Sequence, residues 1–194
     1  MTSNMKKLSE SVWGDIRKRA DGKTERQENT FKFNIDKLKE VDLGLYVPFY
    51  WADFDLEANG EYFFNWYEVE AMLPQIKKTG WRLPYGPFEL KSFIKTILRR
   101  PELETEFHPE AYGMIKNSAI NTYVSFPTSS EFGESYWVED DYRTKYPGEK
   151  VVSGTERCFY MGNEYFEGNK KMTLLSFNNQ ERDKKLKIRL VKDK

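Results

Sequence analysis

The apolar residues of this chain come in short runs that are rich in aromatic and β-branched side chains and are broken by turn residues. This arrangement favours short strands over long helices and predicts strands within 31–35, 41–54 and 61–67. From residue 157 onward, the same pattern predicts a C-terminal antiparallel meander with turns at Gly162-Asn163 and Gly168-Asn169. With the helices described next, the expected fold class is α+β, built on a short sheet.

The last predicted strand alternates apolar and basic residues. Its apolar positions are Leu186, Ile188 and Leu190, and its basic positions are Lys185, Lys187 and Arg189. Because successive side chains of a strand point to opposite faces, we expect one face in the core and one cationic face in water.

Two helices are predicted. The clearer one spans 88–99, after Pro87 and before Pro101, and its apolar residues recur at helical spacing: Leu90, Phe93, Ile94, Ile97 and Leu98. Asn65 and Glu68 form a capping box for the other helix, whose length we expect Pro74 to limit.

Residues 101–155 show little periodicity and many Pro, Gly, Ser, Glu and Asp residues, which predicts a long irregular midsection. Irregular segments displayed on a rigid scaffold commonly carry function. We therefore expect the ligand-binding surface on an exposed loop here, where acidic and aromatic side chains gather: Glu139, Asp140, Asp141, Tyr142 and Tyr146.

The first 30 residues form a segment distinct from 31–194. Leu8, Val12, Trp13 and Ile16 lie at helical spacing, which predicts a short amphipathic helix ending in the basic residues 17–19. The stretch 23–29 has no apolar residue and predicts an extended arm. Two interpretations are open: the helix packs on its own domain, or its four apolar residues dock onto another protein.

Composition excludes several classes of function. The 31 Lys and Arg residues equal the 31 Asp and Glu residues, so we expect no nucleic-acid partner. One Cys and one His exclude zinc sites built from those residues and an intrachain disulfide. The sequence contains no apolar run of membrane-spanning length, no signal-peptide pattern and no glycine-rich phosphate loop, so we expect no membrane contact, no export and no cofactor.

Acidic residues alternate at Asp53, Asp55 and Glu57, a pattern that superficially resembles a calcium loop. Ala58 stands where an EF-hand requires glycine, so we expect an acidic face in water and no metal. Acidic residues of the midsection would also suit a hydrolase, although paired carboxylates have no fixed spacing in sequence.

Cys158 and His108 are the only thiol and the only imidazole. Cys158 lies within a predicted aromatic strand, so we expect it to pack in the core. His108 precedes a proline and is expected in a loop. No motif predicts that the two form a catalytic dyad.

Three spaced motifs resemble those of the Fibrobacter succinogenes major paralogous (FISUMP-type) domains. They are Val41-Asp42-Leu43-Gly44-Leu45 with Trp51-Ala52, Glu61-Tyr62-Phe63 with Trp66, and Trp81-Arg82-Leu83-Pro84 with Glu89-Leu90. Ser135-Tyr136-Trp137, Leu175-Ser176-Phe177 and Ile188-Arg189-Leu190-Val191 resemble the downstream motifs, so the similarity covers about residues 41–191.

The resemblance implies a C-type-lectin-like fold in which Trp81, Leu83 and Trp137 are buried and Arg82 points outward. The lectins' EPN and WND motifs do not occur, so no calcium-dependent sugar site is implied. Residues 85–87 and 138–140 depart from the family pattern, which indicates a diverged display surface.

The opening residues 8–29 are similar to N-terminal segments of virion proteins from crAss-like phages of Bacteroidales. Together the two resemblances predict a non-enzymatic binding or structural module, of the virion accessory or head-fibre type, on the virion surface. Its expected partners are a capsid or tail subunit, or a second copy in an oligomer, and its expected ligand is a surface glycan or a host protein. The alternatives are a cytoplasmic protein-interaction domain of a Bacteroidales host and a hydrolase.

Overall fold

The chain divides into two units, Met1–Lys32 and Phe33–Lys194. The computed structural model describes residues 31–86, 88–108, 112–127, 133–140, 154–166 and 170–194, together with two short strands near the N-terminus. These two strands, β1 (Arg17–Lys18) and β2 (Thr24–Glu25), pair antiparallel.

The first unit corrects the end of the predicted N-terminal helix. Arg17 and Lys18, expected in its last turn, lie in a strand instead, with Arg17 opposite Glu25. Opposite charges across a strand pair favour this pairing. The predicted docking residues Leu8, Val12, Trp13 and Ile16 lie outside the described residues, and their role stays a prediction.

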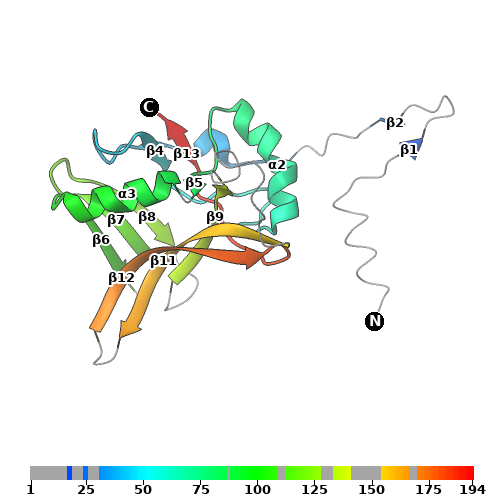
Figure 1. Ribbon diagram of the computed structural model, residues 1–194. Helices are drawn as coiled ribbons and strands as arrows, with labels where there is room; N and C mark the ends of the chain where they lie inside the picture. The colour runs from blue at the N-terminus through cyan, green and yellow to red at the C-terminus, as the bar shows by residue number, and fades with distance from the viewer. Residues whose placement is uncertain are drawn as a thin grey trace. The chain divides into compact units, whose positions relative to one another are not determined.

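The described residues of the second unit form a mixed α+β structure, as predicted, with two helices and mostly antiparallel sheets (Figure 1). Its described strands form three three-stranded sheets and one two-stranded sheet. The three-stranded sheets are β3 (Glu40–Val41), β4 (Phe49–Ala52) and β13 (Val191–Asp193); β6 (Leu103–His108), β7 (Tyr112–Asn117) and β8 (Thr122–Pro127); and β9 (Gly133–Trp137), β11 (Thr155–Phe166) and β12 (Lys170–Glu181). The parallel pair is β5 (Tyr85–Gly86) with β10 (Glu139–Asp140).

The predicted helix over 88–99 is confirmed as α3 (Phe88–Arg99), which lies across the β6-β7-β8 sheet in Figure 1. Leu90 and Phe93 are buried, and Ile97 packs against the core. Leu98, expected on the buried face, is 80% exposed. The row of apolar side chains turns gradually around the helix axis, so its last member no longer faces the core.

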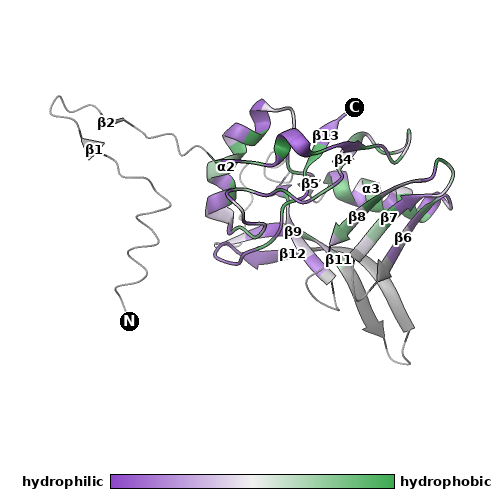
Figure 2. Ribbon diagram, turned by 180° about the vertical axis from the view of Figure 1, so that it is seen from behind, coloured by the Kyte–Doolittle hydropathy of each residue, from purple (hydrophilic) through white to green (hydrophobic). Residues whose placement is uncertain are grey.

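The capping box is confirmed at the start of α2 (Trp66–Lys78). The Glu68 backbone N–H donates to Asn65 Oδ1 at 3.0 Å, and the Asn65 N–H donates to Glu68 Oε2 at 2.8 Å. Pro74 does not end this helix. Pro74 and Glu70, whose carbonyl it leaves unpaired, both lie on the exposed face, where water can hydrate that carbonyl. Figure 2 shows both hydrophobic and hydrophilic segments along α2.

The core is centred on Trp51 of β4. Its ring lies 5.3 Å from that of Phe49, 5.4 Å from that of Phe126 and 5.8 Å from that of Phe93, measured between centroids. Gly113 of β7 allows close approach to β11, since a Cβ there would lie 2.8 Å from Met161 Sδ. Residues from β4, α3, the β6-β7-β8 sheet, β9 and β11 thus share one core.

The prediction of an irregular midsection over 101–155 is wrong for its described part, which forms β6 to β10. In β8, for example, Val124 and Phe126 are buried while Tyr123 and Ser125 are not. Strands with one wet face carry apolar residues only at every second position, so their composition resembles that of a loop. His108 correspondingly ends β6 rather than lying in a loop.

Two further corrections concern the predicted meander. β11 runs through Gly162-Asn163 without a turn and pairs with β12 along its whole length. The last predicted strand is regular only at β13, whereas residues 186–190 run extended between several neighbouring segments.

The burial of Trp81, Leu83 and Trp137 is confirmed. Arg82 does not point into water: it is also buried, and its Nη2 donates to Glu89 Oε1 at 2.7 Å while its Nε donates to Asp193 Oδ1 at 3.1 Å. The guanidinium therefore ties the start of α3 to β13, which compensates for its desolvation.

Candidate functional site

Of the three basic residues predicted to face water in the last strand, Lys187 and Arg189 are buried, whereas Lys185 is exposed as expected. Arg189 has no exposed surface, and Lys187 is 7% exposed. They lie two positions apart in an extended segment, so both side chains point to the same side. That side carries Asp55, which is likewise buried. The predicted exposure to water is therefore corrected for Lys187, Arg189 and Asp55.

Arg189 is held by three acceptors from the segment 52–55. Its Nε donates to Asp55 Oδ1 at 2.8 Å, and its Nη1 donates to the carbonyls of Ala52 at 2.9 Å and Asp53 at 2.8 Å. The backbone brings these groups together, since the Leu56 N–H donates to the Ile188 carbonyl at 2.9 Å. The buried guanidinium is thus compensated by a charge and by backbone acceptors.

Lys187 has a different set of neighbours. Its Nζ donates to the Pro127 carbonyl at 2.6 Å and lies 3.4 Å from Asp55 Oδ2 and 3.6 Å from Glu134 Oε2. The same Nζ lies 5.3 Å from the centre of the Phe63 ring. The ammonium is therefore surrounded by two carboxylates, one carbonyl and one aromatic face.

Tyr136 completes this buried group. Its hydroxyl donates to the Pro127 carbonyl at 3.3 Å. Burial, and then the charge of Asp55, raise the pKa of Tyr136 well above its ordinary value. We call Asp55, Glu134, Tyr136, Lys187 and Arg189 the buried polar cluster; its two cations and two carboxylates balance in charge.

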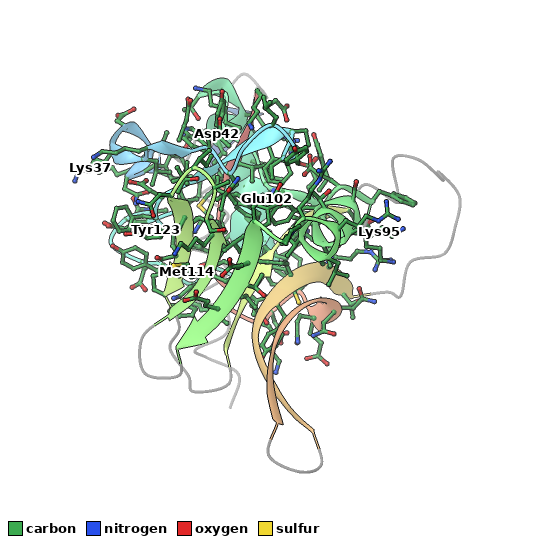
Figure 3. The ribbon with its side chains drawn as sticks, turned by 90° about the vertical axis from the view of Figure 1, so that its left-hand side faces the viewer. Lys37, Asp42, Lys95, Glu102, Met114 and Tyr123 are labelled. Atoms are coloured by element: carbon green, nitrogen blue, oxygen red, sulfur yellow. The ribbon has the colours of Figure 1, made fainter. Side chains whose placement is uncertain are left out.

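A cleft of about 550 Å³ opens over part of this cluster. Aromatic rings and polar side chains share its lining: Asn34, Lys37, Leu38, Phe54, Asp55, Glu57, Tyr62, Phe63, Pro127 and Lys187. Phe54 is 62% exposed and Tyr62 is 44% exposed, so both rings are accessible to a ligand in the cleft. Figure 3 shows Lys37 projecting outward from the 3₁₀ turn η1 (Ile35–Lys37).

The rim of the cleft is ordered by local hydrogen bonds. Asn34 acts as a clamp, since its Nδ2 donates to the Asp55 carbonyl at 3.1 Å and its Oδ1 accepts from the Glu57 N–H at 2.9 Å. The Tyr62 hydroxyl donates to Glu57 Oε2 at 2.8 Å, and this bond raises the pKa of Tyr62. The two rim residues Glu57 and Tyr62 thus orient each other.

The expected conformation of the predicted ligand-binding loop is corrected where the structure describes it, while its binding role stays a prediction. Glu139 and Asp140 form β10 instead of an exposed loop. Glu139 Oε1 accepts from Lys77 Nζ at 2.9 Å, and Asp140, whose side chain is 5% exposed, lies 3.4 Å from Arg157 Nε. Neither residue lines the cleft. Asp141, Tyr142 and Tyr146 lie outside the described residues.

No group of three or more His, Cys, Asp or Glu side chains in the described ranges is arranged to hold a metal ion. The three alternating acids go to separate partners: Asp53 Oδ1 accepts from the Lys39 N–H at 2.7 Å, Asp55 pairs with Arg189, and Glu57 accepts from Tyr62.

Cys158 is buried, as predicted. Burial raises its pKa to about 11, which keeps the thiol protonated at neutral pH and makes it a poor nucleophile.

Sequence reasoning did not find the cleft. One signal was available: alternating acids at 53–57 and alternating bases at 185–189 have the same period and opposite charge, which favours pairing across two extended segments.

Comparisons of this chain with protein-family models, with curated proteins and with solved structures find no match. Neither α2 nor α3, the helices in the described part of the chain, is long and apolar enough to span a membrane.

Proposed function

We propose that this protein is a non-enzymatic binding module and that its ligand occupies the cleft over the buried polar cluster. The observation that carries the proposal is the lining of that cleft: exposed rings of Phe54 and Tyr62 beside the charged floor formed by Asp55 and Lys187. Ligand sites typically combine apolar walls with a few fixed polar groups, and this volume lies within their usual range.

The geometry supports binding over hydrolysis. A hydrolytic pair of carboxylates needs one group able to donate a proton to the leaving group. Here both Asp55 oxygens face cations, and Glu139 and Asp140 are each engaged with a basic side chain. These carboxylates are arranged as fixed counterions.

The two resemblances described in the sequence analysis support a proposal about the fold family of this module and about the particle that carries it. Because of the FISUMP-type motifs, we propose that the second unit is related to C-type-lectin-like domains. Because of the similarity of the N-terminal segment to virion proteins, we propose that the protein is part of a phage particle. A capsid or tail subunit, or a second copy, would then contact the N-terminal segment. Capsid and tail genes beside this gene would support the virion assignment, and bacterial housekeeping genes there would favour a host protein.

A ligand-observed NMR screen tests the binding function. The full-length protein is mixed with three sets of compounds: neutral sugars, sugar acids and sugar phosphates, and blocked amino acids. Saturation transfer is measured on the wild type, on Phe54→Ala and on Tyr123→Ala. Tyr123, labelled in Figure 3, is an exposed ring on β8. It is not among the residues that line the cleft, which makes it a matched control.

We expect at least one compound to bind the wild type and Tyr123→Ala with saturation and to bind Phe54→Ala more weakly. If no compound of any set binds, or if Phe54→Ala binds as well as the wild type, the cleft is not the binding site.

A further inference from the structure

Resting on the proposed function, we infer that the ligand of the cleft is a neutral, hydroxyl-bearing ring, a sugar residue, and that Lys187 is the polar anchor that selects it. Three features of the cleft support this inference: the donor capacity of Lys187, the balance of charge, and the exposed aromatic walls.

Lys187 lines the cleft, and only one of its N–H donors makes a short hydrogen bond. An ammonium group carries three N–H donors. The structure gives Lys187 Nζ one short hydrogen bond, to the Pro127 carbonyl at 2.6 Å, while its two carboxylate contacts at 3.4 and 3.6 Å are longer than usual charge-assisted hydrogen bonds. A ligand hydroxyl or ring oxygen can therefore accept from this ammonium without displacing the Pro127 carbonyl.

The charges around the cleft disfavour an ionic ligand. Asp55 and Glu134 balance Lys187 and Arg189 below, and Glu57 and Lys37 carry opposite charges at the rim. A ligand carboxylate on Lys187 would approach Asp55 and Glu134, and like charges at close range in a shielded site are costly. A neutral acceptor meets the same donor without that repulsion.

The walls suit the apolar face of a sugar ring. The face of an aromatic ring carries partial negative charge, so it attracts the polarised C–H groups that line one side of a pyranose. Phe54 and Tyr62 expose their rings at the cleft, and the Tyr62 hydroxyl is fixed on Glu57. Glu57 and Lys37 then remain available to hydroxyls at the edge of the sugar.

Matched sugar pairs test the inference. The probes are methyl glycosides of glucose and galactose, which mimic residues within a glycan, the free sugars, and glucuronic and galacturonic acids, in which a carboxylate replaces the CH₂OH group. Dissociation constants are measured by NMR titration of the full-length protein. The variants are Phe54→Ala and Lys187→Met, with Tyr123→Ala as the control.

We expect a neutral sugar to bind at least about tenfold more tightly than its uronic acid. Phe54→Ala should weaken binding by about two- to tenfold, and Tyr123→Ala should leave it unchanged. Lys187→Met should abolish binding if circular dichroism shows the native fold. If this variant does not fold, the inference is tested by comparing the dissociation constants of the neutral sugar and its uronic acid on the wild type. A methyl glycoside that binds as well as the free sugar indicates a glycan as the source, and preference for the free sugar indicates a small metabolite.

Four outcomes overturn the inference. If the uronic acid binds as tightly as its neutral counterpart, or if Lys187→Met is folded and binds like the wild type, the neutral-sugar selection by Lys187 is wrong. If only blocked amino acids bind, and Phe54→Ala weakens them, the sugar class is wrong while the binding cleft stands. If no compound binds, both proposals fail.

Discussion

Asp55 is the residue on which both buried cations converge, so its charge should matter for stability. Asp55→Asn keeps the size of the side chain but leaves the fully buried Arg189 without its counterion. We expect a loss of about 3–5 kcal/mol in the free energy of unfolding, measured by urea denaturation. Asp36→Asn, on the exposed surface of η1, should cost less than about 0.5 kcal/mol. Equal small losses of unfolding free energy in both variants would contradict a structural role for the Asp55–Arg189 ion pair.

Cys158 gives a test that depends on pH. Its thiolate forms only as the pH approaches about 11, because burial raises the pKa from 9.0. At pH 8 this lowers the thiolate fraction by about a hundredfold. Ellman's reagent should therefore react slowly with the native protein and quickly with the protein in urea. Equal rates in the two states would place the thiol at the surface.

The sequence predicted burial better for aromatic residues than for charged ones. Trp81, Trp137 and Cys158 are buried as expected. Burying an apolar side chain lowers the free energy whatever its position in the sequence. Arg82, Lys187 and Arg189 were misplaced because a charge is buried only when a partner distant in sequence meets it. Asp55 lies far from Arg189 along the chain, and alternation alone does not identify which strands become neighbours.

Local sequence signals specify both helices, and the buried face of α3 can be tested directly. Phe93 is buried against Phe49 and Trp51, whereas Lys91 is exposed. Phe93→Ala should cost about 3–5 kcal/mol in the free energy of unfolding, and Lys91→Ala less than about 0.5 kcal/mol. Urea melts of both variants measure the difference, and similar values would reject the assignment of the buried face.

The helices were predictable because their evidence is local. Capping and helical spacing involve residues three or four positions apart, and these were correct for Asn65, Glu68 and Phe93. The strands β6 to β10 were not recognised because their stability comes from pairing and from one buried face. The cleft combines η1, the segment 54–63, the end of β8 and Lys187, so no local pattern describes it.

The second unit holds its own core, which leads to a prediction about the whole chain. The described members of the core cluster all lie between Val41 and Val191. Deleting residues 1–30 should therefore change the thermal midpoint by less than about 2 °C, measured by calorimetry. If the N-terminal segment docks onto partners, the same deletion should abolish self-association in light scattering or incorporation into particles.

Two results would contradict this prediction. A fall of about 10 °C or more in the midpoint would show that the first 30 residues contribute to the fold of the second unit. A truncated protein that still assembles like the full chain would remove the docking role from Leu8, Val12, Trp13 and Ile16.

The extended segment 186–193 joins parts of the fold that are made much earlier. Its backbone pairs with Phe64, Ser135, Leu56, Ala52 and Arg82, and its side chains neutralise Asp55. A ribosome synthesises all of those partners first, and they cannot be joined until this segment has left the exit tunnel. During translation, the earlier strands and helices wait with an acidic residue uncompensated and several backbone groups unpaired, so the second unit can complete its fold only after this segment has emerged.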